Sequence, residues 1–544
     1  MRIRDTIAQV LANPALRGLQ ASWLIGIAAE KAYLVALLVF AYEIGGVVAV
    51  GVFTMLASLP SGLLGPVLSS VAESFAPARA LLGLHLGRAA VVAAAAIAVA
   101  ADLGIWIVVA AAIAEGILSR QHTATTRALL PALARTPEEL VASNGVTSVA
   151  EGVGSLIGPV GAGVLLLVGG PALGLAVPAV AYFVAALLVL AIHVPRTVRS
   201  GAEPADIRGR LVETVGGFRA LVRYPNAGLL IGLMLIQVVV RGALTVLLVS
   251  TAYELLGIGD AGVGYLNSAI GAGALVGALL AMTVAAGRGL ARTFSLSLAL
   301  WGAPMAVMGI APNPLVAFAM AGVIGAANSS IDVAGYTLLA RCLPNEARGR
   351  SFGVLHSLVG ICVAIGALVA PLLIQAVGLQ LALVICGLVL PAFALVSYRS
   401  VHRTESQAIV PERELRVMRT IPMFAPLPLT ALEDMARALV PVEYAAGTRV
   451  ITQGERGDCF YLIASGEVEV VHDGHRQTTL GAGDGFGEIA LLSDRPRTAT
   501  IQVVDRMDGY RLPREPFLEA VTGNASSVLA ADELVARRLA ELQH

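Results

Sequence analysis

The chain of 544 residues is 57% hydrophobic and 14% charged, and its formal net charge is zero. Soluble domains carry roughly a quarter charged residues, so this composition, with a mean hydropathy of +0.80, excludes an ordinary soluble enzyme. The balanced charge predicts no nucleic-acid partner, and the four cysteines lack Cys-x-x-Cys spacing, which predicts free thiols and no metal site.

The hydrophobic residues fall in runs of about 20, the length that crosses a bilayer as a helix. Six runs precede the arginine-rich stretch 193–225 and six follow it: 20–43, 47–70, 78–101, 104–124, 140–168, 173–193, 226–255, 262–285, 292–311, 314–340, 351–376 and 378–398. Two hydrophobic halves around a central loop are typical of duplicated transporters. We therefore expect an α-helical membrane protein with a six-helix bundle at 1–192, a loop at 193–225 and a second bundle at 226–398.

The basic residues lie on one side of the predicted spans. The central loop holds Arg196, Arg199, Arg208, Arg210, Arg219 and Arg223, and the loops assigned to the same side hold Arg79, Arg88, Arg127, Arg135, Arg288, Arg292, Arg341, Arg348 and Arg350. The opposite loops contain no lysine or arginine. Because basic loops stay inside, the pattern predicts a multi-pass protein of the cell membrane with both termini in the cytoplasm.

The composition changes after Tyr398. Residues 399–412 read as a polar linker, and residues 413–544 as a soluble domain that contains strands and glycine turns, as in 449–471. The last segment predicts an amphipathic helix whose apolar positions are Leu529, Leu534, Leu539 and Leu542.

One stretch of this tail, "GFGEIALLSDRPRTAT" (485–500), has the residues of an anion site. Gly487 lets the backbone approach a ligand closely, and a short helical turn after it would point free N–H groups at an anion. Arg497 supplies a fixed charge with paired donors, whereas the acceptor Glu488 suits a hydroxyl. Because a carboxylate repels phosphate, the ligand should carry separate anionic and hydroxyl ends, as a cyclic nucleotide does.

These residues resemble the phosphate-binding cassette of cyclic-nucleotide-binding domains, and the upstream stretch "GERGDCFYLIASGEVEV" (454–470) resembles the β-roll of that family. The resemblance implies a β-roll with flanking helices in which Arg497 binds the cyclic phosphate, Glu488 the ribose hydroxyl, and the amides of Gly487 to Ala490 the phosphate oxygens. The implied nucleotide site comprises Phe486, Gly487, Glu488, Ile489, Ala490, Leu491, Arg497, Thr498 and Ala499. We favour cAMP as the regulatory ligand, but cGMP stays open because Thr498 supplies a hydroxyl. A domain that keeps the fold without the ligand is the alternative, and pairing into a homodimer also stays open.

The membrane part resembles the major facilitator superfamily, particularly its drug- and siderophore-exporter-like branches. Residues 13–43, 125–167 and 341–358 carry the likeness, which covers about 10–398. The signature loop of the superfamily departs from its usual pattern here, where the sequence reads "SSVAESFAPARAL" (69–81). The resemblance implies twelve spans in the major facilitator fold and a secondary transporter.

Charged residues within spans are costly and therefore point to function. The residues that we expect to line the transport cavity or to couple transport are Glu30, Lys31, Glu115, Glu151, Gln237, Arg241 and Asp332. Bridges between helices are the structural alternative, and for Glu151 and Arg241 both interpretations stay open. Four acids against two bases leave carboxylates that could carry a proton. Arg120 and His122 are predicted to be gate or interface residues.

The leading hypothesis is a secondary transporter that exports a small molecule under the control of cytoplasmic cyclic nucleotide. Its expected partners are the lipid bilayer, the nucleotide and an unidentified substrate. A solute-sensing receptor and a lipid or lysolipid flippase with the same tail are the alternatives. The sequence contains no nucleophile–base set, metal cluster or phosphate-binding loop of an enzyme. We therefore predict that the protein has no enzymatic activity.

Overall fold

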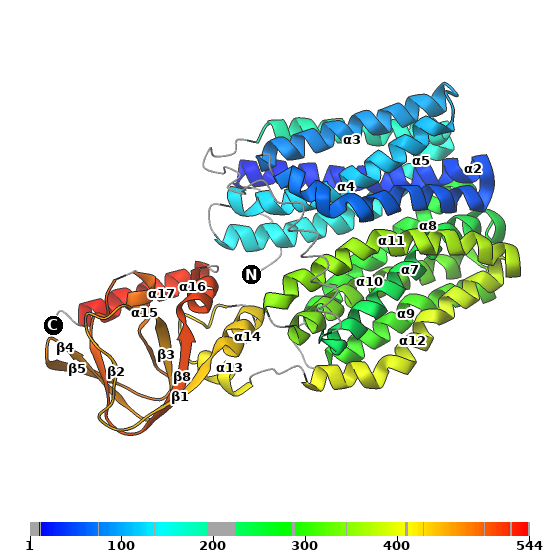
Figure 1. The fold of residues 1–544 in the computed structure, drawn as a ribbon. Helices are drawn as coiled ribbons and strands as arrows, with labels where there is room; N and C mark the ends of the chain where they lie inside the picture. The colour runs from blue at the N-terminus through cyan, green and yellow to red at the C-terminus, as the bar shows by residue number, and fades with distance from the viewer. Residues whose placement is uncertain are drawn as a thin grey trace. The chain divides into compact units, whose positions relative to one another are not determined.

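The chain forms two compact units in the computed structural model (Figure 1). The first comprises Met1–Ala134 with Glu139–Ala408, and the second Arg135–Glu138 with Ile409–His544. The residues that the structure describes are 10, 12–73, 76–134, 137–192, 223–284, 289–343, 345–407, 412–427, 429–493, 495–522 and 525–541. Most of the predicted central loop, 193–225, therefore lies outside the described residues.

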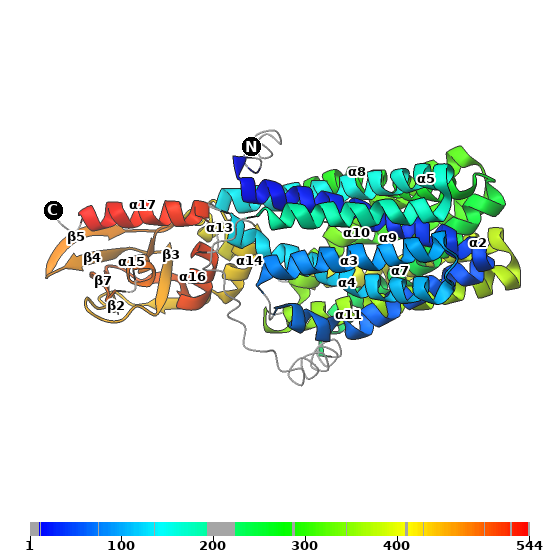
Figure 2. The same ribbon diagram turned by 90° about the horizontal axis from the view of Figure 1, so that it is seen from above.

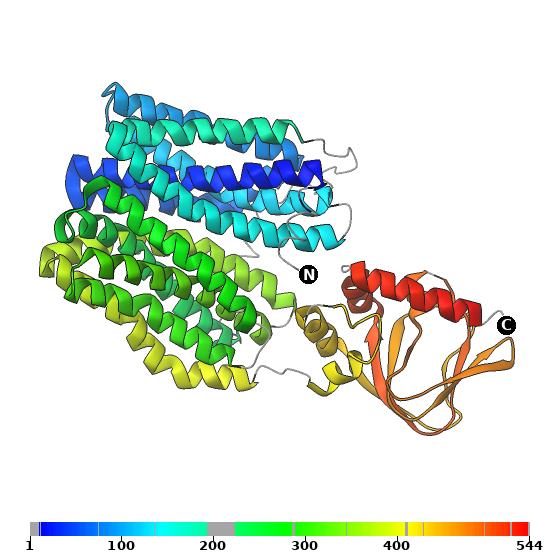
Figure 3. The same cartoon turned by 180° about the vertical axis from the view of Figure 1, so that it is seen from behind.

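The first unit is a bundle of long helices (Figures 1 and 3). They are α2 (Pro14–Glu73), α3 (Pro77–Ala100), α4 (Ile105–Leu133), α5 (Pro137–Leu190), α7 (Pro225–Ser250) with the π-helical turn η1 (Thr251–Leu255), α8 (Gly259–Val284), α9 (Leu290–Ile310), α10 (Pro314–Cys342), α11 (Asn345–Val377) and α12 (Leu379–Gln407). Within the described ranges, nine helices are long and apolar enough to cross a membrane. The predicted helical membrane fold is confirmed.

Two of these helices are broken by glycine pairs. Gly46 in α2 has a φ of 58° and Gly170 in α5 a φ of 61°, a backbone conformation that glycine adopts at little cost. Each break falls between two predicted apolar runs, so α2 and α5 each contain two helical segments. Because α4 is not among the nine apolar helices, the number of twelve spans stays a prediction.

The two halves of this bundle meet along the pairs α2–α11 and α5–α8. A Cβ on Gly360 of α11 would lie 2.6 Å from the carbonyl oxygen of Ser58 in α2, and one on Gly264 of α8 would collide with the carbonyl oxygen of Pro159 in α5. Close backbone approach at small residues is how helices gain packing energy in lipid, where apolar burial alone gives little.

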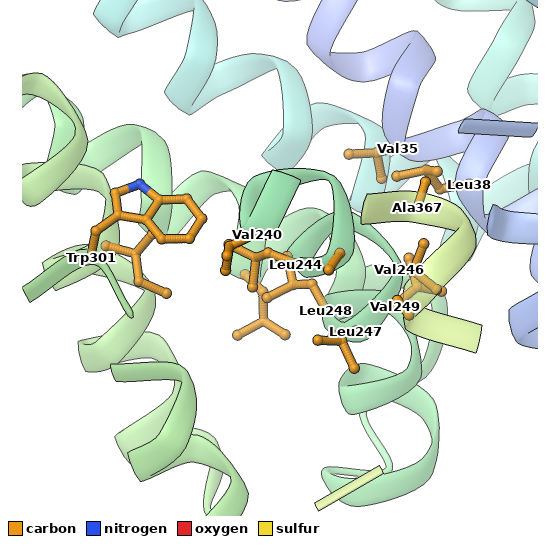
Figure 4. Packing of buried hydrophobic residues seen from close by; sticks show 14 of the residues in the cluster. Val35, Leu38, Val240, Leu244, Val246, Leu247, Leu248, Val249, Trp301 and Ala367 are labelled. Carbon is orange, nitrogen blue, oxygen red and sulfur yellow. The ribbon is translucent and has the colours of Figure 1, made fainter. Parts of the chain in front are cut away.

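A continuous apolar cluster runs through the bundle. Figure 4 shows side chains of α7, such as Leu244 and Leu248, between Trp301 of α9 and a group that contains Val35 and Ala367. Dense packing of this kind makes the interior of the bundle stiff.

The second unit is a β-roll with helices. It contains α13 (Glu412–Met418), α14 (Leu429–Ala438), β1 (Val440–Tyr444), β2 (Arg449–Ile451), β3 (Cys459–Ser465), β4 (Val468–His472), β5 (His475–Leu480), β6 (Gly485–Phe486), α15 (Glu488–Leu492), β7 (Thr500–Val503), β8 (Met507–Pro513), α16 (Arg514–Thr522) and α17 (Ala525–Glu541). Two four-stranded antiparallel sheets have the orders β1-β8-β3-β6 and β2-β7-β4-β5. Figure 2 shows α17 running along one side of the strands.

The expected polar linker at 399–412 is wrong over its first part, because α12 continues to Gln407. The carboxylate of Glu405 accepts hydrogen bonds from the backbone N–H groups of Gly289 (3.0 Å), Leu290 (2.8 Å) and Ala291 (3.2 Å) at the start of α9. A carboxylate satisfies the free donors of a helix N-terminus. This tertiary contact holds a polar sequence in a helix.

Candidate functional site

Gly487 connects β6 to the short helix α15 at the centre of the predicted nucleotide site. Its φ is 96°, which disfavours any other residue. A Cβ there would lie 2.6 Å from an Nη1 atom of Arg497. Glycine is therefore needed both for the backbone turn and for the space that the guanidinium occupies.

Arg497 is held rigidly beneath this turn. Its side chain donates to the carbonyl oxygens of Gly487 (2.9 Å) and Cys459 (2.8 Å) and contacts Oδ1 of Asp458 at 3.3 Å. The residue is only 5% exposed. The guanidinium is thus fixed by two neutral carbonyls and by an ion pair with the exposed Asp458, and its position suits an anion at the start of α15.

Glu488 is 1% exposed and lies beside the same turn. Its Oε1 accepts a hydrogen bond of 2.7 Å from Arg538 of α17, which also donates to the carbonyl oxygen of Gly485 at 2.8 Å. Its Oε2 is buried and has no hydrogen-bond partner in the described part of the chain. Leaving a buried acceptor unpaired costs about 1–3 kcal/mol, so this oxygen is an open position for a hydroxyl donor.

These groups line a cavity of about 910 Å³. Eight of the nine predicted nucleotide-site residues line it, and the ninth, Leu491, packs into the apolar core formed by the helices and β3. Apolar walls come from Ile451, Val470, Leu480 and Ile501. The arrangement provides an anion position at one end, a hydroxyl acceptor beside it and apolar surfaces beyond.

Arg537 and Arg538 also line the cavity, and the sequence interpretation missed them. The sequence predicts an amphipathic helix in this segment, but no local signal says which surface its polar face covers. The adjacent arginines were the one available hint, because paired arginines suit an anionic or carboxylate partner.

Burial also shifts the acidities of two β3 side chains beneath the site. Tyr461 stacks on Phe486 with ring centroids 5.1 Å apart, and desolvation raises the pKa of Tyr461 to about 12. Burial likewise raises the pKa of the Cys459 thiol. Both groups are therefore neutral at physiological pH and act as part of the packed floor.

In the first unit, Arg88 corrects a sequence expectation. The pattern of basic residues places it in a cytoplasmic loop, whereas in the structure it is fully buried within α3. Its Nη2 donates to Glu30 (2.8 Å), Glu115 (2.5 Å) and the hydroxyl of Tyr182 (2.6 Å). Two carboxylates compensate one guanidinium, and this permits its burial. The expected count of four acids against two bases is therefore wrong by one base.

Lys31 extends this first cluster, with its Nζ 3.4 Å from Oε1 of Glu30. Glu30, Lys31 and Glu115 are thus brought together in the first half of the bundle. The second half holds a separate group: Gln237 donates to Asn328 Oδ1 (3.3 Å), and Asn328 donates to Asp332 Oδ2 (3.1 Å).

Asp332 in turn interacts electrostatically with Arg241 and with Glu151 of α5. The seven predicted residues therefore divide between a compensated cluster in one half and a second group at the meeting of the halves.

Arg120 and His122 separate in the structure. Arg120 donates to Oγ of Ser61 (3.2 Å) and to the carbonyl oxygen of His356 in α11 (3.3 Å), so it links the two halves. His122 is fully buried and stacks on Trp23 with centroids 4.9 Å apart. The expectation of an interface role is wrong for His122, because its side chain points into the first half.

Comparison with known proteins finds family models that match two segments of the chain. Residues 441–524 match the family model described as "Cyclic nucleotide-binding domain", and residues 230–441 match "Major Facilitator Superfamily". A cAMP-dependent protein kinase regulatory subunit of Yarrowia lipolytica is 39% identical over 102 residues, which are 18% of this chain and 27% of that protein. A cGMP-dependent protein kinase of Plasmodium berghei is 39% identical over 90 residues, or 16% of this chain and 10% of that protein.

Among solved structures, the regulatory domain of Toxoplasma gondii PKA with cAMP is 32% identical over 20% of this chain and 44% of that chain, with a TM-score of 0.20. That score is too low to carry an argument. The chain spans about a quarter or less of the length of the two curated relatives named above. The likeness to them therefore concerns the second unit. The two matched segments, one to a major facilitator superfamily model and one to a cyclic-nucleotide-binding domain model, are the two classes of domain that the motifs predict.

Proposed function

We propose that the chain is a secondary transporter of the cell membrane that exports a small molecule and is regulated by cytoplasmic cyclic nucleotide. The observation that carries the regulatory part is the pairing of a rigid Arg497 guanidinium with the unpartnered Oε2 of Glu488 in one cavity. A cyclic phosphate supplies the anion and a ribose hydroxyl supplies the donor. One ligand thereby satisfies both ends of the site.

We favour cAMP as this ligand. The named relatives include a cAMP-dependent regulatory subunit and a cGMP-dependent kinase at the same 39% identity, so the choice needs a direct measurement. Calorimetric titration of the purified full chain with cAMP and cGMP provides it. A lower dissociation constant for cGMP would reverse the preference. If neither nucleotide binds, the second unit keeps the fold without the ligand.

Regulation would begin at α17. The Arg538 side chain already occupies one oxygen of Glu488, so a ribose that binds this carboxylate changes the contacts of α17. Helix α17 packs on α16, α16 on α14, and α14 on α13. Since α13 follows α12 in the chain, this series of packed helices leads to the last helix of the transporter. Nucleotide then biases transport only if it binds the two transporter states with different affinity.

Alternating access is supported by contacts between the halves toward both ends of the bundle. Near the Gly45–Gly46 break, the Tyr42 hydroxyl donates to Glu254 at 3.0 Å, and its ring stacks on Tyr253 with centroids 4.2 Å apart. Farther toward the opposite end, Arg120 bonds the carbonyl oxygen of His356. Breaking one set while keeping the other opens one side at a time. The direction, export, rests on the resemblance to exporter-like branches.

The proposal is tested in proteoliposomes that contain the full chain with its nucleotide domain facing the lumen. Flux is measured with and without cAMP in the lumen, and binding is checked on the same protein. Equal rates with nucleotide bound would contradict regulation. Saturable counterflow of a substrate excludes a receptor that carries no flux, whereas movement of a fluorescent lipid alone would indicate a flippase.

A further inference from the structure

Arg241 is an unusual charge within the bundle. It lies well inside α7, which begins at Pro225 and continues through η1 to Leu255, and its side chain is half-buried. In the described part of the chain, no carboxylate oxygen lies within 4.0 Å of its guanidinium. An ionised side chain at such depth is costly unless a partner or a ligand compensates it.

The contrast with Arg88 shows that this chain can compensate such a charge when the role is structural. Arg88 has Glu30, Glu115 and Tyr182 around one guanidinium nitrogen. Arg241 has Asp332 within electrostatic range but without an ion pair, and Asp332 instead accepts from Asn328. Among the described residues, the second half therefore keeps a guanidinium that has no hydrogen-bond or ion-pair partner.

Further positive charge faces Arg241 from the first half. Arg120 of α4 interacts electrostatically with Arg241, and His356 of α11 interacts with both Arg120 and Arg127. Of the acidic groups in the described part of the chain, Asp332 interacts electrostatically with Arg241 and also with Glu151. Among these described side chains, the three arginines Arg120, Arg127 and Arg241 outnumber the two carboxylates by one positive charge. Exposed side chains of this group come from both halves: Arg127 and Glu151 from the first half, and Asp332 and His356 from the second.

Aromatic side chains belong to the same group. Tyr336 of α10 stacks on His356 with centroids 6.1 Å apart and an interplanar angle of 22°, and its ring centroid lies 5.7 Å from that of Phe352. Tyr336 also interacts electrostatically with Arg241, Asp332 and Arg127. Planar guanidinium donors next to aromatic faces suit a planar acid, because carboxylate and phosphate bind bidentately to arginine while rings stack.

We propose that this group is the substrate site of the transporter and that its substrate is an aromatic organic anion held by Arg241 and Arg120. The inference rests on the proposed transport function and specifies its substrate class. The anionic group compensates the two arginines, and the ring lies against Tyr336. Asp332 and Glu151 favour a ligand that also carries a hydrogen-bond donor.

The test uses the full chain in lipid nanodiscs and three probes that share a phenyl ring: benzoate, phenylphosphonate and phenyltrimethylammonium. Thermal unfolding is followed against probe concentration, because a ligand that binds only the folded state raises the melting temperature. We expect both anions to raise it and the cation to leave it unchanged. In Arg241→Gln the half-maximal anion concentration should rise about 10- to 100-fold, as expected when a charged hydrogen-bonding partner is lost.

Two controls separate the ligand role from a structural one. Arg292→Gln removes an exposed arginine of α9 and should leave the anion response unchanged. Without any probe, Arg241→Gln should melt no lower than the wild type, because it removes an uncompensated charge, whereas Arg88→Gln should melt lower. If Arg241→Gln cannot be purified, Arg120→Gln provides the second measurement of anion affinity.

Stabilisation by the cation alone, no response to either anion, or an undiminished response in Arg241→Gln would overturn the proposal. The transport proposal fails separately. If the anions bind in a way that depends on Arg241 but no probe crosses the membrane of proteoliposomes, the proposed anion site stands and the proposed transport function is refuted. If the cation is transported at the same rate in the wild type and in Arg241→Gln, the proposed transport function stands and the proposed anion site is refuted.

Discussion

Replacement of Arg497 by lysine tests the nucleotide site most directly, because it keeps the positive charge and removes the planar set of guanidinium donors. The guanidinium reaches two carbonyl oxygens and Asp458 from two nitrogens, at 2.9, 2.8 and 3.3 Å. A lysine has one nitrogen on a flexible stem and cannot hold both carbonyls and a phosphate.

The structure sets the size of the effect. Losing the paired donors to a cyclic phosphate removes about 1.5–3 kcal/mol of charged hydrogen bonding, so we expect nucleotide affinity to fall about 10- to 150-fold. The buried carbonyls of Gly487 and Cys459 lose a donor as well. That loss should lower the free energy of unfolding of the second unit by about 1–3 kcal/mol.

Calorimetry with cAMP on the full chain measures the affinity for the nucleotide. Urea unfolding, followed by far-ultraviolet circular dichroism, measures the stability of the second unit. Arg495→Lys is the matched control, because Arg495 lies two residues away and is exposed. It should change neither quantity. Wild-type affinity in Arg497→Lys would refute the assignment of the phosphate position, even if the domain remained folded.

Three further changes test other parts of the chain. Glu488→Gln should weaken nucleotide binding about tenfold and increase hydrogen exchange in α17, since Arg538 loses its ionic partner; unchanged exchange would argue against that contact. Arg88→Gln should destabilise the bundle by about 3–5 kcal/mol because two carboxylates lose their base, and adding Glu115→Gln should recover part of the loss in thermal unfolding. The pKa of Tyr461 is raised from 10.0 to about 12 in the folded state, so the unfolded chain loses this proton at a lower pH than the folded chain. The free energy of unfolding of the second unit is therefore at its full value below pH 10 and falls by about 2 kcal/mol between pH 10 and pH 12. Tyr461→Phe should flatten that part of the pH profile, and an identical decline in both proteins would contradict the shift.

The sequence was most informative where function depends on local chain geometry. The turn at Gly487, the carboxylate of Glu488 and the later Arg497 lie within fifteen residues of one another, and their chemistry alone pointed to a ligand with an anion and a hydroxyl. The apolar runs likewise follow from the length of a helix across a bilayer. Even the breaks in α2 and α5 fall where the runs were separated, because paired glycines mark them.

Tertiary structure decided which distant charges share a partner. The rule that basic residues gather near the cytoplasmic ends of helices predicts a loop position for Arg88. Only the folded bundle shows that Glu30 and Glu115 pair with this side chain. The helical end of α12 depends on Glu405 reaching the start of α9, and the role of Arg538 depends on which surface α17 covers.

The same holds for Arg241, for which the sequence left a structural bridge and a cavity role equally open. Its lack of an ion pair in the described structure favours a ligand role. The sequence by itself predicted the two classes of domain and the residues proposed to bind nucleotide, since periodicity and short motifs are local properties of the chain. Compensation of a buried charge depends on distances between helices remote in sequence, so only the tertiary structure could separate the paired arginine from the free one.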